Sequence, residues 1–314
     1  MRKKEDRKGP VNNLKDQVIA FFDKCNEGGY GAQDRNMESC LRFAEYLGEN
    51  TNLQKMQNAE ARHLYKYVEY MKAKGLAVST MMTDLSGIRF YYKRNGCKNE
   101  LPTNDKLNLG QREVGKYDRA WLPGEIDRCY ALANLKGKPD IEAAMDFMLH
   151  FGLRIDEATS LKLSYLKRAL NYGQLMVTGK GGKQRVIDFD ESGKHKAIIE
   201  KWLSFAEAGG KYPTDYLICD KKCRSVEKKK KSMQNWLIRM KKQILEPGRS
   251  ELTEPGKKPR RDTISFHGLR HTFAQNYLTE LSYMNPKDAR LKVSQALGHE
   301  RMEITRVYTN EKKT

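Results

Sequence analysis

Apolar residues recur every three or four positions through much of this chain, which is the spacing of one face of an α-helix. In the first hundred residues four such stretches are separated by Gly28-Gly29, by the polar residues near position 51 and by Gly75. The repeating sets are Leu14, Val18, Phe21 and Phe22; Met37, Cys40, Leu41 and Ala44; Leu64, Tyr67, Val68 and Met71; and Met81, Leu85, Ile88 and Tyr92. This pattern predicts a small helical bundle in which these side chains form the core.

The helical pattern stops between Gly96 and about Asp118, where proline and glycine interrupt a polar stretch. Such a composition is typical of a linker. A length of 314 residues also suits two domains, at roughly 100–200 residues per domain. We therefore expect a basic N-terminal arm over residues 1–10, a helical domain over 11–95, a linker over 96–118 and a second domain over 119–314.

Beyond the linker, helical and strand-like patterns are mixed. One helix face is predicted over residues 141–149, and a further helix from about 155 to 163. Residues 174–178 and 184–189 read as two strands that a glycine-rich turn joins, which predicts a hairpin. Asn285-Pro286 and Gly298 suit the start and the end of a late helix. The predicted fold class is mainly α with a small β-sheet.

The net charge of +19 makes a polyanion the expected partner, and most of the surplus lies beyond residue 118. Two basic clusters, at 221–231 and 257–261, stand out there. Each is by itself a solvated loop or helix face, but together they favour phosphate contacts. No apolar run is long enough to cross a bilayer, and six scattered cysteines do not make a disulfide scaffold. We expect a cytoplasmic protein with no membrane partner.

Common metal and nucleotide motifs are missing from the sequence. Cys219 and Cys223 come nearest to a zinc site, but no second pair completes it. We find neither a Gly-x-x-x-x-Gly-Lys-Ser/Thr loop nor a clear carboxylate cluster for a two-metal nuclease. If this chain acts on nucleic acid, we expect it to do so without a metal or another cofactor.

Cationic and imidazole side chains gather instead in short segments of the second domain. They are Phe151-Gly-Leu-Arg-Ile-Asp-Glu157, Gly179-Lys-Gly-Gly-Lys183, His267-Gly-Leu-Arg-His271, and Leu297-Gly-His299 followed nine residues later by Tyr308. Each has a plain structural alternative. Arg154 and Glu157 could form a surface ion pair on a helix. The lysines could be incidental to a flexible turn, and the histidines could belong to a helix start and a loop.

Taken together, the order and spacing of these segments resemble the tyrosine recombinases, the phage-type integrases. The resemblance covers residues 119–309 and is most specific over 263–309. It implies an N-terminal helical core-binding domain and a C-terminal mixed α/β catalytic domain. It also implies a site-specific recombinase that cuts and rejoins DNA strands through a 3′-phosphotyrosine, with no metal and no ATP, in integration, excision or resolution of a mobile element.

The resemblance also implies a role for each residue of the segments. Tyr308 would attack the phosphorus, and His267 would take the proton of its hydroxyl. Arg154 and Arg270 would clamp the non-bridging oxygens, since guanidinium groups suit phosphate geometry. The other implied site residues are Lys180, which would protonate the leaving 5′-oxygen with Lys183 as the alternative, His299, which would donate a hydrogen bond to the phosphate, and Glu157, which would orient an arginine.

The expected partner is a double-stranded DNA recombination site, bound by a homo-tetramer during synapsis and by a protein that is a monomer free in solution. Accessory DNA-bending proteins are a further possible partner, and the expected location is the bacterial nucleoid. Six residues follow Tyr308, which leaves open how the protomers control one another. Two rival hypotheses remain: a DNA-binding protein of the same fold that does not cut, and a topoisomerase of type IB that acts as a monomer.

Overall fold

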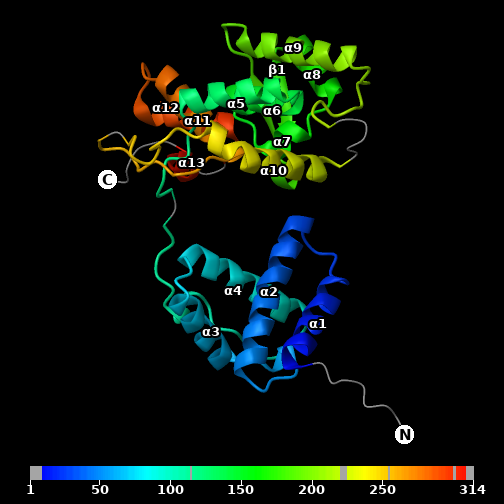
Figure 1. Cartoon of the computed structure of the whole chain (residues 1–314), viewed down its shortest axis with the longest axis vertical. Coiled ribbons are helices and arrows are strands. Elements are labelled where there is room, and N and C mark those ends of the chain that lie inside the picture. The colour runs from blue at the N-terminus through cyan, green and yellow to red at the C-terminus, as the bar shows by residue number, and fades with distance from the viewer. Residues whose placement is uncertain (1–8, 114, 220–224, 254, 300–301, 309–314) are drawn as a thin grey trace. The chain divides into compact units, whose positions relative to one another are not determined.

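The structure is a computed structural model, and it describes residues 9–113, 115–219, 225–253, 255–299 and 302–308. Helices dominate the described residues, and two strands form one small sheet (Figure 1). The chain divides into two compact units, residues 1–113 and 114–314, and each has its own core. The predicted fold class is therefore confirmed. Residues 1–8 of the expected N-terminal arm lie outside the described residues. No described helix is long and apolar enough to cross a membrane.

The first unit is a bundle of helices. The predicted apolar sets all lie in its core or pack against it, because each set occupies one face of its helix. Its elements are α1 (Pro10–Phe22), α2 (Tyr30–Asn50), the 3-10 helix η1 (Met56–Asn58), α3 (Ala61–Ala73), α4 (Val78–Arg94) and the 3-10 helix η2 (Asp105–Leu107).

A buried carboxylate joins three of these helices. Asp84 of α4 is 1% exposed, and it accepts hydrogen bonds from Arg42 and Ser39 of α2 and from the Tyr67 hydroxyl of α3. The distances are 3.0 Å from Nε of Arg42, 3.1 Å from Ser39 and 3.3 Å from Tyr67. Because a buried charge is costly without such partners, these contacts fix how α2, α3 and α4 pack together.

The described residues of the stretch 96–118 are irregular apart from η2 and mostly exposed, but a few of them are anchored in the core. Leu107 and Leu109 are buried in the core of the first unit. Arg89 of α4 donates to the carbonyl of Pro102 at 2.9 Å and to the Asn104 side chain at 2.8 Å. At the other end, Asp118 belongs to the second unit, where its amide donates to the carbonyl of Pro259 at 2.9 Å. A glycine- and proline-rich pattern indicates irregular backbone, and it does not report whether that backbone packs.

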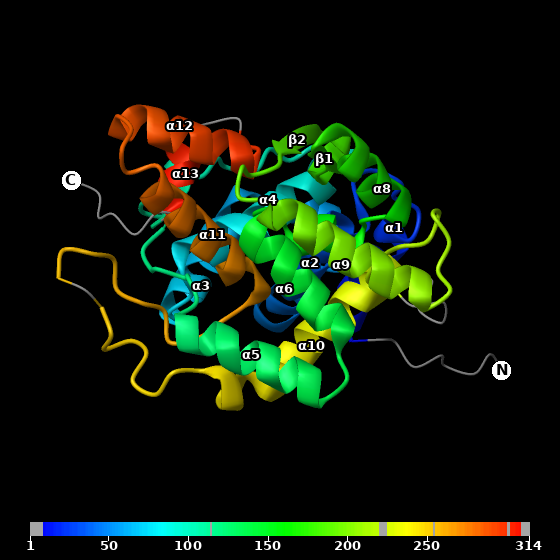
Figure 2. The ribbon, with the colours of Figure 1, turned by 90° about the horizontal axis from the view of Figure 1, so that it is seen from above.

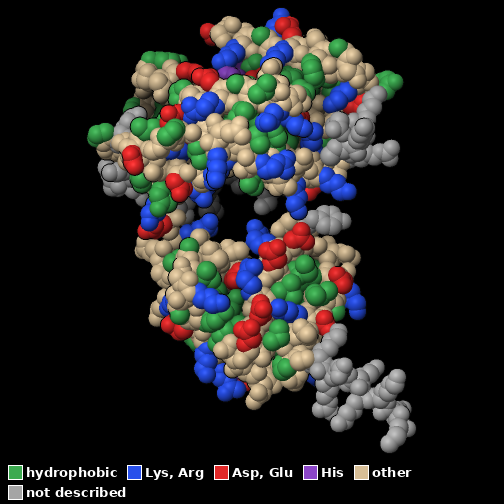
Figure 3. Space-filling view, viewed as in Figure 1, with side chains coloured by type: hydrophobic (Ala, Val, Ile, Leu, Met, Phe, Trp, Pro, Cys, Tyr) green, Lys and Arg blue, Asp and Glu red, His purple; other side chains and the backbone are tan. Residues whose placement is uncertain are grey.

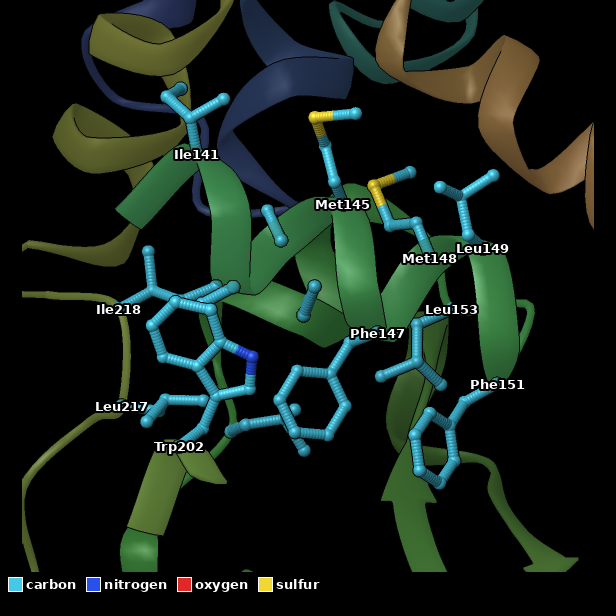
Figure 4. Packing of buried hydrophobic residues seen from close by; sticks show 14 of the residues in the cluster. Ile141, Met145, Phe147, Met148, Leu149, Phe151, Leu153, Trp202, Leu217 and Ile218 are labelled. Atoms are coloured by element: carbon cyan, nitrogen blue, oxygen red, sulfur yellow. The ribbon is translucent and has the colours of Figure 1, made fainter. Parts of the chain in front are cut away.

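The second unit surrounds α6 (Pro139–His150). Most side chains of α6 are buried whichever way they point, as expected of a helix that other elements cover on several sides. Figure 4 shows Phe147, Leu153 and Trp202 meeting in this core. The other elements are α5 (Pro123–Leu135), α7 (Ile155–Thr159), α8 (Leu163–Tyr172), β1 (Gln174–Thr178), the 3-10 helix η3 (Lys180–Gly182), β2 (Gln184–Asp188), α9 (Lys194–Ala208), α10 (Val226–Ile244), α11 (Phe266–Glu280), α12 (Pro286–Leu297) and α13 (Met302–Tyr308).

The helix predicted over 155–163 is wrong in its length, because α7 ends at Thr159. The Ser160 hydroxyl donates to the carbonyl of Asp156 at 2.7 Å, in competition with the helical backbone bonds. The backbone beyond it pairs with a distant segment: the Leu217 amide donates to the carbonyl of Leu161 at 2.8 Å, and Lys162 pairs with Tyr216. This tertiary pairing requires extended backbone, so α8 starts afresh at Leu163.

The predicted hairpin and the predicted late helix are both confirmed. Strands β1 and β2 pair antiparallel with Thr178 opposite Gln184. Asn285 caps α12 by accepting a hydrogen bond from the Lys287 amide at 2.9 Å. Gly298 ends α12 with a φ of +62°, and a Cβ there would lie 2.6 Å from Cδ of Arg185. The end of α12 therefore lies against β2, as Figure 2 shows.

A buried ion pair joins α5 to the segment after α10. Arg249 and Glu125 are 3% and 0% exposed, and Nε of Arg249 donates to Glu125 at 2.7 Å. The same guanidinium donates to the carbonyls of Ala120 and Arg261, and Glu125 also accepts from the Leu122 amide at 2.8 Å. One charge pair thus connects three segments that are distant in sequence.

We expect Glu125→Ala to lower the free energy of unfolding of the second unit by about 3–5 kcal/mol, because it leaves a buried guanidinium unpaired. Tryptophan fluorescence during urea denaturation measures this unit, since Trp121, Trp202 and Trp236 all lie in it. Glu207→Ala is the control, because it removes the exposed pair with Lys167 and should cost under about 1 kcal/mol. Equal effects of the two substitutions would contradict the expectation.

Candidate active site

A cleft of about 1320 Å³ opens on the second unit. It lies where the start of α7, the β1–β2 hairpin, the end of α12 and α13 meet, and Figure 2 shows α12 and α13 beside the hairpin. Most of the segments singled out in the sequence contribute to its wall. The lining residues include Arg154, Glu157, Gly179, Lys183, Arg185, Gly298, His299 and Tyr308.

Glu157 organises one side of the cleft from inside α7. It is 3% exposed, and it accepts hydrogen bonds from the amide and the guanidinium of Arg154, both at 2.8 Å. Its Oε2 also accepts from Arg185 of β2 at 2.6 Å and lies 4.0 Å from Nη1 of Arg270. Burial opposes the ionisation of Glu157, but Arg185 above all, together with Arg154 and Arg270, keeps its pKa below the ordinary value.

Arg270 of α11 is fully buried beneath the cleft. It donates to the carbonyls of Gly152 and Leu297, and its Nη2 lies 3.3 Å from Nε2 of His299. Gly152 has a φ of +60°, and a Cβ there would lie 2.5 Å from the Phe273 ring, so glycine is required where its carbonyl faces the arginine. Nε of Arg270 has no hydrogen-bond partner among the described residues.

Around Glu157 and Arg270 the arginine side chains carry more positive charge than the one carboxylate neutralises. Burial, and then the nearby Arg154 and Arg185, lower the pKa of Arg270 to about 9. Three guanidinium groups surround the single carboxylate of Glu157, so the site is prepared for an anion. Within the described part of the chain, no three His, Cys, Asp or Glu side chains are grouped so as to hold a metal ion.

Tyr308 ends α13 and is 8% exposed. Its hydroxyl lies 3.3 Å from Nε2 of His267, and its ring stacks on His271 with 4.4 Å between the centroids. The His299 ring lies 4.8 Å from it by the same measure, and the guanidinium carbon of Arg270 lies 5.6 Å from the centroid. A phenol, three imidazoles and a buried guanidinium from one chain therefore meet at one place.

The three imidazoles are held neutral at neutral pH. Burial, followed by repulsion from Arg270 and other arginines, lowers the pKa of His267 to about 4 and that of His299 to about 3. Burial and the neighbouring His267 strongly lower the pKa of His271 as well. Neutral His267 can accept the proton of the Tyr308 hydroxyl through Nε2, because only the neutral ring has an acceptor nitrogen.

The hairpin carries both lysines, Lys180 and Lys183, that are candidates for the proton donor to the leaving oxygen. Lys180 begins η3, but its side chain lies outside the described part of the structure. Lys183 lines the cleft, and its carbonyl accepts from the Gly179 amide at 2.7 Å. A Cβ on Gly179 would lie 3.1 Å from Oε1 of Glu157, so the turn passes directly over the arginine–glutamate cluster. Either lysine is therefore carried on a turn at the mouth of the site.

Sequence reasoning missed two members of the site, Arg185 and His271. Arg185 lies in a strand that was interpreted only as part of a hairpin, yet it donates to both Glu157 and the carbonyl of Ala296. Its position two residues after Lys183 was the available signal, because a strand leaving the turn stays near the site. His271 follows His267 by four residues, which places both rings on one face of α11.

Part of the charge in the two basic clusters is engaged inside the unit. Lys229 lies 2.8 Å from Asp140, and Lys230 lies 2.8 Å from Asp156. Residues 221–224 of the first cluster lie outside the described residues. In the second cluster, Arg260 pairs with Asp118 at 3.2 Å. Other Lys and Arg side chains lie on the visible surface of the second unit, including the area over α10 (Figure 3).

Comparison with known proteins places this arrangement in a family. The model of the phage integrase family matches residues 123–314. The chain is 27% identical over 251 residues to the tyrosine recombinase XerC of Psychromonas ingrahamii, covering 77% of this chain and 73% of that protein. It is 26% identical over 294 residues to the tyrosine recombinase XerD of Oceanobacillus iheyensis, covering 89% of each. The chain belongs to the phage integrase family of tyrosine recombinases, enzymes that cleave and rejoin DNA.

Solved structures share the fold. The XerH site-specific recombinase bound to a palindromic difH substrate superposes with a TM-score of 0.60 and 20% identity, covering 94% of this chain and 80% of that one. A lambda integrase tetramer bound to a Holliday junction gives a TM-score of 0.65 and 14% identity, covering 98% and 79%. At these identities the likeness concerns the fold alone.

Because its buried histidines are neutral, we expect acid to destabilise the second unit. A histidine whose pKa is lower in the folded than in the unfolded state binds its proton only on unfolding, so stability falls as pH drops below about 6.5. We expect His271→Leu to reduce that slope between pH 6.5 and 4.5 by up to about 1.4 kcal/mol per pH unit. Urea denaturation followed by tryptophan fluorescence measures it. The same slope in both proteins would mean that His271 is protonated in the folded state.

Proposed function

We propose that this chain is a site-specific recombinase whose nucleophile is Tyr308. The observation that carries the proposal is the 3.3 Å contact between the Tyr308 hydroxyl and Nε2 of neutral His267, beside the buried Arg270. A phenol has an ordinary pKa near 10, so it needs a base to become a nucleophile at neutral pH. All three residues come from one chain, so each protomer would attack within its own site.

The proposed first step is attack of the Tyr308 oxygen on the phosphorus of a phosphodiester. The bond to the 5′-oxygen breaks, and that oxygen takes a proton from Lys180 or Lys183. A 3′-phosphotyrosine forms, and the tyrosine proton passes to His267. Negative charge that builds on the non-bridging oxygens is stabilised by Arg154 and Arg270, with His299 as a further donor. The same charge relieves the repulsion between His267 and the arginines, so the imidazole becomes a stronger base as the phosphate is engaged.

Glu157 would act through the arginines rather than on the phosphate. Its carboxylate holds the guanidinium of Arg154 at 2.8 Å and that of Arg185 at 2.6 Å, and both arginines line the cleft. Guanidinium groups fixed before the reaction lose little freedom in the transition state. Arg154 and Arg270, with His299 as a further donor, would therefore provide the charge stabilisation for which other phosphoryl-transfer enzymes use a metal ion.

Rejoining is the reverse of this step. A 5′-hydroxyl gives its proton to the lysine of the turn as it attacks the phosphotyrosine, and Tyr308 leaves with a proton from His267. Because the covalent bond retains the energy of the phosphodiester, neither step needs ATP. A hydroxyl from a second duplex would complete strand exchange, in integration, excision or resolution of a mobile element.

The proposed partner is a double-stranded recombination site. Residues 119–314 would form the catalytic domain, joined through residues 96–118 to a core-binding domain over 11–95, with residues 1–10 as a basic arm. The XerH and lambda integrase structures named above hold recombination DNA, and the latter is a tetramer. By analogy, four copies of this chain would assemble at synapsis from free monomers, with accessory DNA-bending proteins where the site requires them, in the bacterial cytoplasm at the nucleoid.

The first test uses a suicide substrate, a recombination site selected from genomic fragments and nicked near the cleavage position, in EDTA. We expect a covalent protein–DNA adduct that Tyr308→Phe abolishes while DNA binding persists. Tyr283→Phe is the matched control, since Tyr283 is 80% exposed and should not affect the adduct. A requirement for Mg²⁺ would overturn the mechanism.

The same experiment separates the two rival functions. Adducts on arbitrary DNA, with supercoil relaxation by the monomer, would indicate a topoisomerase. Binding without an adduct would indicate a DNA-binding protein that does not cut.

The second test identifies the lysine that protonates the leaving oxygen. We expect one of Lys180→Met and Lys183→Met to slow cleavage by about 10²–10⁴-fold, as loss of a general acid does. A substrate with sulfur in place of the 5′-bridging oxygen should restore that variant, because a thiolate leaves without a proton. The other variant serves as the control. If sulfur restores neither slow variant, the lysine acts on a non-bridging oxygen instead.

A further inference from the structure

The helix that carries Tyr308 depends on its surroundings for its position. Helix α13 has seven residues, and isolated helices shorter than about 12 residues are marginal in water. Its described side chains pack against a small core that includes Val293 and Leu297 of α12. The Thr305 hydroxyl lies 3.1 Å from Nδ1 of His299, which fixes one side of the helix.

Lys258 holds the carboxyl end of the same helix. Its ammonium donates to the carbonyl of Arg306 at 2.7 Å, and the residue is only 7% exposed. The last carbonyls of a helix have no partner within it, and a cation there also interacts favourably with the helix dipole. Burying an ammonium without a hydrogen-bond partner is costly. The end of α13 must therefore lie where the Arg306 carbonyl can accept from Lys258.

The segment around Lys258 is itself anchored within the second unit. The Asp118 amide donates to the carbonyl of Pro259 and the Arg261 amide donates to the carbonyl of Asp118, both at 2.9 Å. Gln275 of α11 donates to Asp118 at 2.8 Å and lies 3.5 Å from the Tyr308 carbonyl. The basic cluster 257–261, which the sequence suggested as a phosphate-binding run, thus reaches the nucleophile helix from a fixed support.

We propose that Lys258 is a positioning residue, which holds the end of α13 so that the Tyr308 hydroxyl faces His267. The inference rests on the proposed role of Tyr308 as nucleophile. Lys258 touches the backbone two residues before Tyr308 and acts through the helix, not on the phosphate. Its loss lets the tyrosine leave the attacking position, and a displacement of about 1 Å can cost about 10²-fold in rate.

This role makes an asymmetric prediction. Before cleavage, Lys258 keeps Tyr308 in place. After cleavage, the bond to phosphorus does so, whether or not the lysine is present. Removing Lys258 therefore raises the free energies of the transition state and of the covalent state by the same amount, relative to the free energy of the uncleaved complex. Cleavage slows, whereas attack of a 5′-hydroxyl on the covalent state does not.

The experiment uses the full chain with Lys258→Met, which keeps the apolar stem and removes the ammonium. Three quantities are measured: DNA affinity, the single-turnover rate of adduct formation on the suicide substrate, and the rate at which the isolated adduct rejoins an added strand with a 5′-hydroxyl. We expect cleavage to fall about 10–100-fold, while affinity and rejoining stay within about 3-fold. Lys258→Arg should recover part of the cleavage rate. Lys257→Met, which removes the same charge from the same cluster, should cleave normally.

Unchanged cleavage by Lys258→Met would overturn the proposal, and so would an equal loss in cleavage and rejoining, because the latter indicates action at the phosphate. A loss of DNA affinity that accounts for the slower cleavage would overturn it too. If Lys258→Met does not fold by tryptophan fluorescence, Lys258→Gln is measured instead. It removes the charge and shortens the side chain, so cleavage should again slow while rejoining does not. Failure of the unsubstituted protein to form any adduct would instead refute the role of Tyr308, and with it this inference.

Discussion

The contact on which the site depends most is that of the Glu157 carboxylate with the arginines around it. Arg154 comes from the start of α7, Arg185 from β2 and Arg270 from α11, so one buried anion brings three elements to one point. The guanidinium groups would repel one another in its absence. With it they lie close together, and they still carry more positive charge than Glu157 neutralises.

The same excess of charge sets the state of the histidines. His267 and His299 are buried among arginines, so both rings are neutral at neutral pH and each keeps an acceptor nitrogen. An isolated histidine would be partly protonated near pH 6.5 and would lose that capacity. On the proposed function the arginines would serve two purposes: they would attract the phosphate, and they keep an acceptor nitrogen free on the imidazole that faces Tyr308.

Much of the fold could be predicted from the sequence because periodicity reports which face of a helix is buried, as in the sets of the first unit. The end of α7 could not be predicted, since the pairing of Leu161 with Leu217 is a tertiary contact that leaves no local pattern. In the site, spacing identified Arg154, Arg270, His267, His299 and Tyr308. It did not identify Arg185, which also lines the cleft, or Lys258, because each acts on a distant segment. Neither resembles anything but an ordinary basic residue of its strand or loop.

Gly298 illustrates how tightly one position can be specified. Its left-handed backbone ends α12, and the space that a Cβ would occupy is taken by the side chain of Arg185. A mutation there faces two separate penalties, one in its own backbone and one in a neighbour that holds Glu157. Relieving one of them leaves the other in force. A side chain at position 298 would therefore disturb two things at once: the end of α12 and the arginine that contacts Glu157.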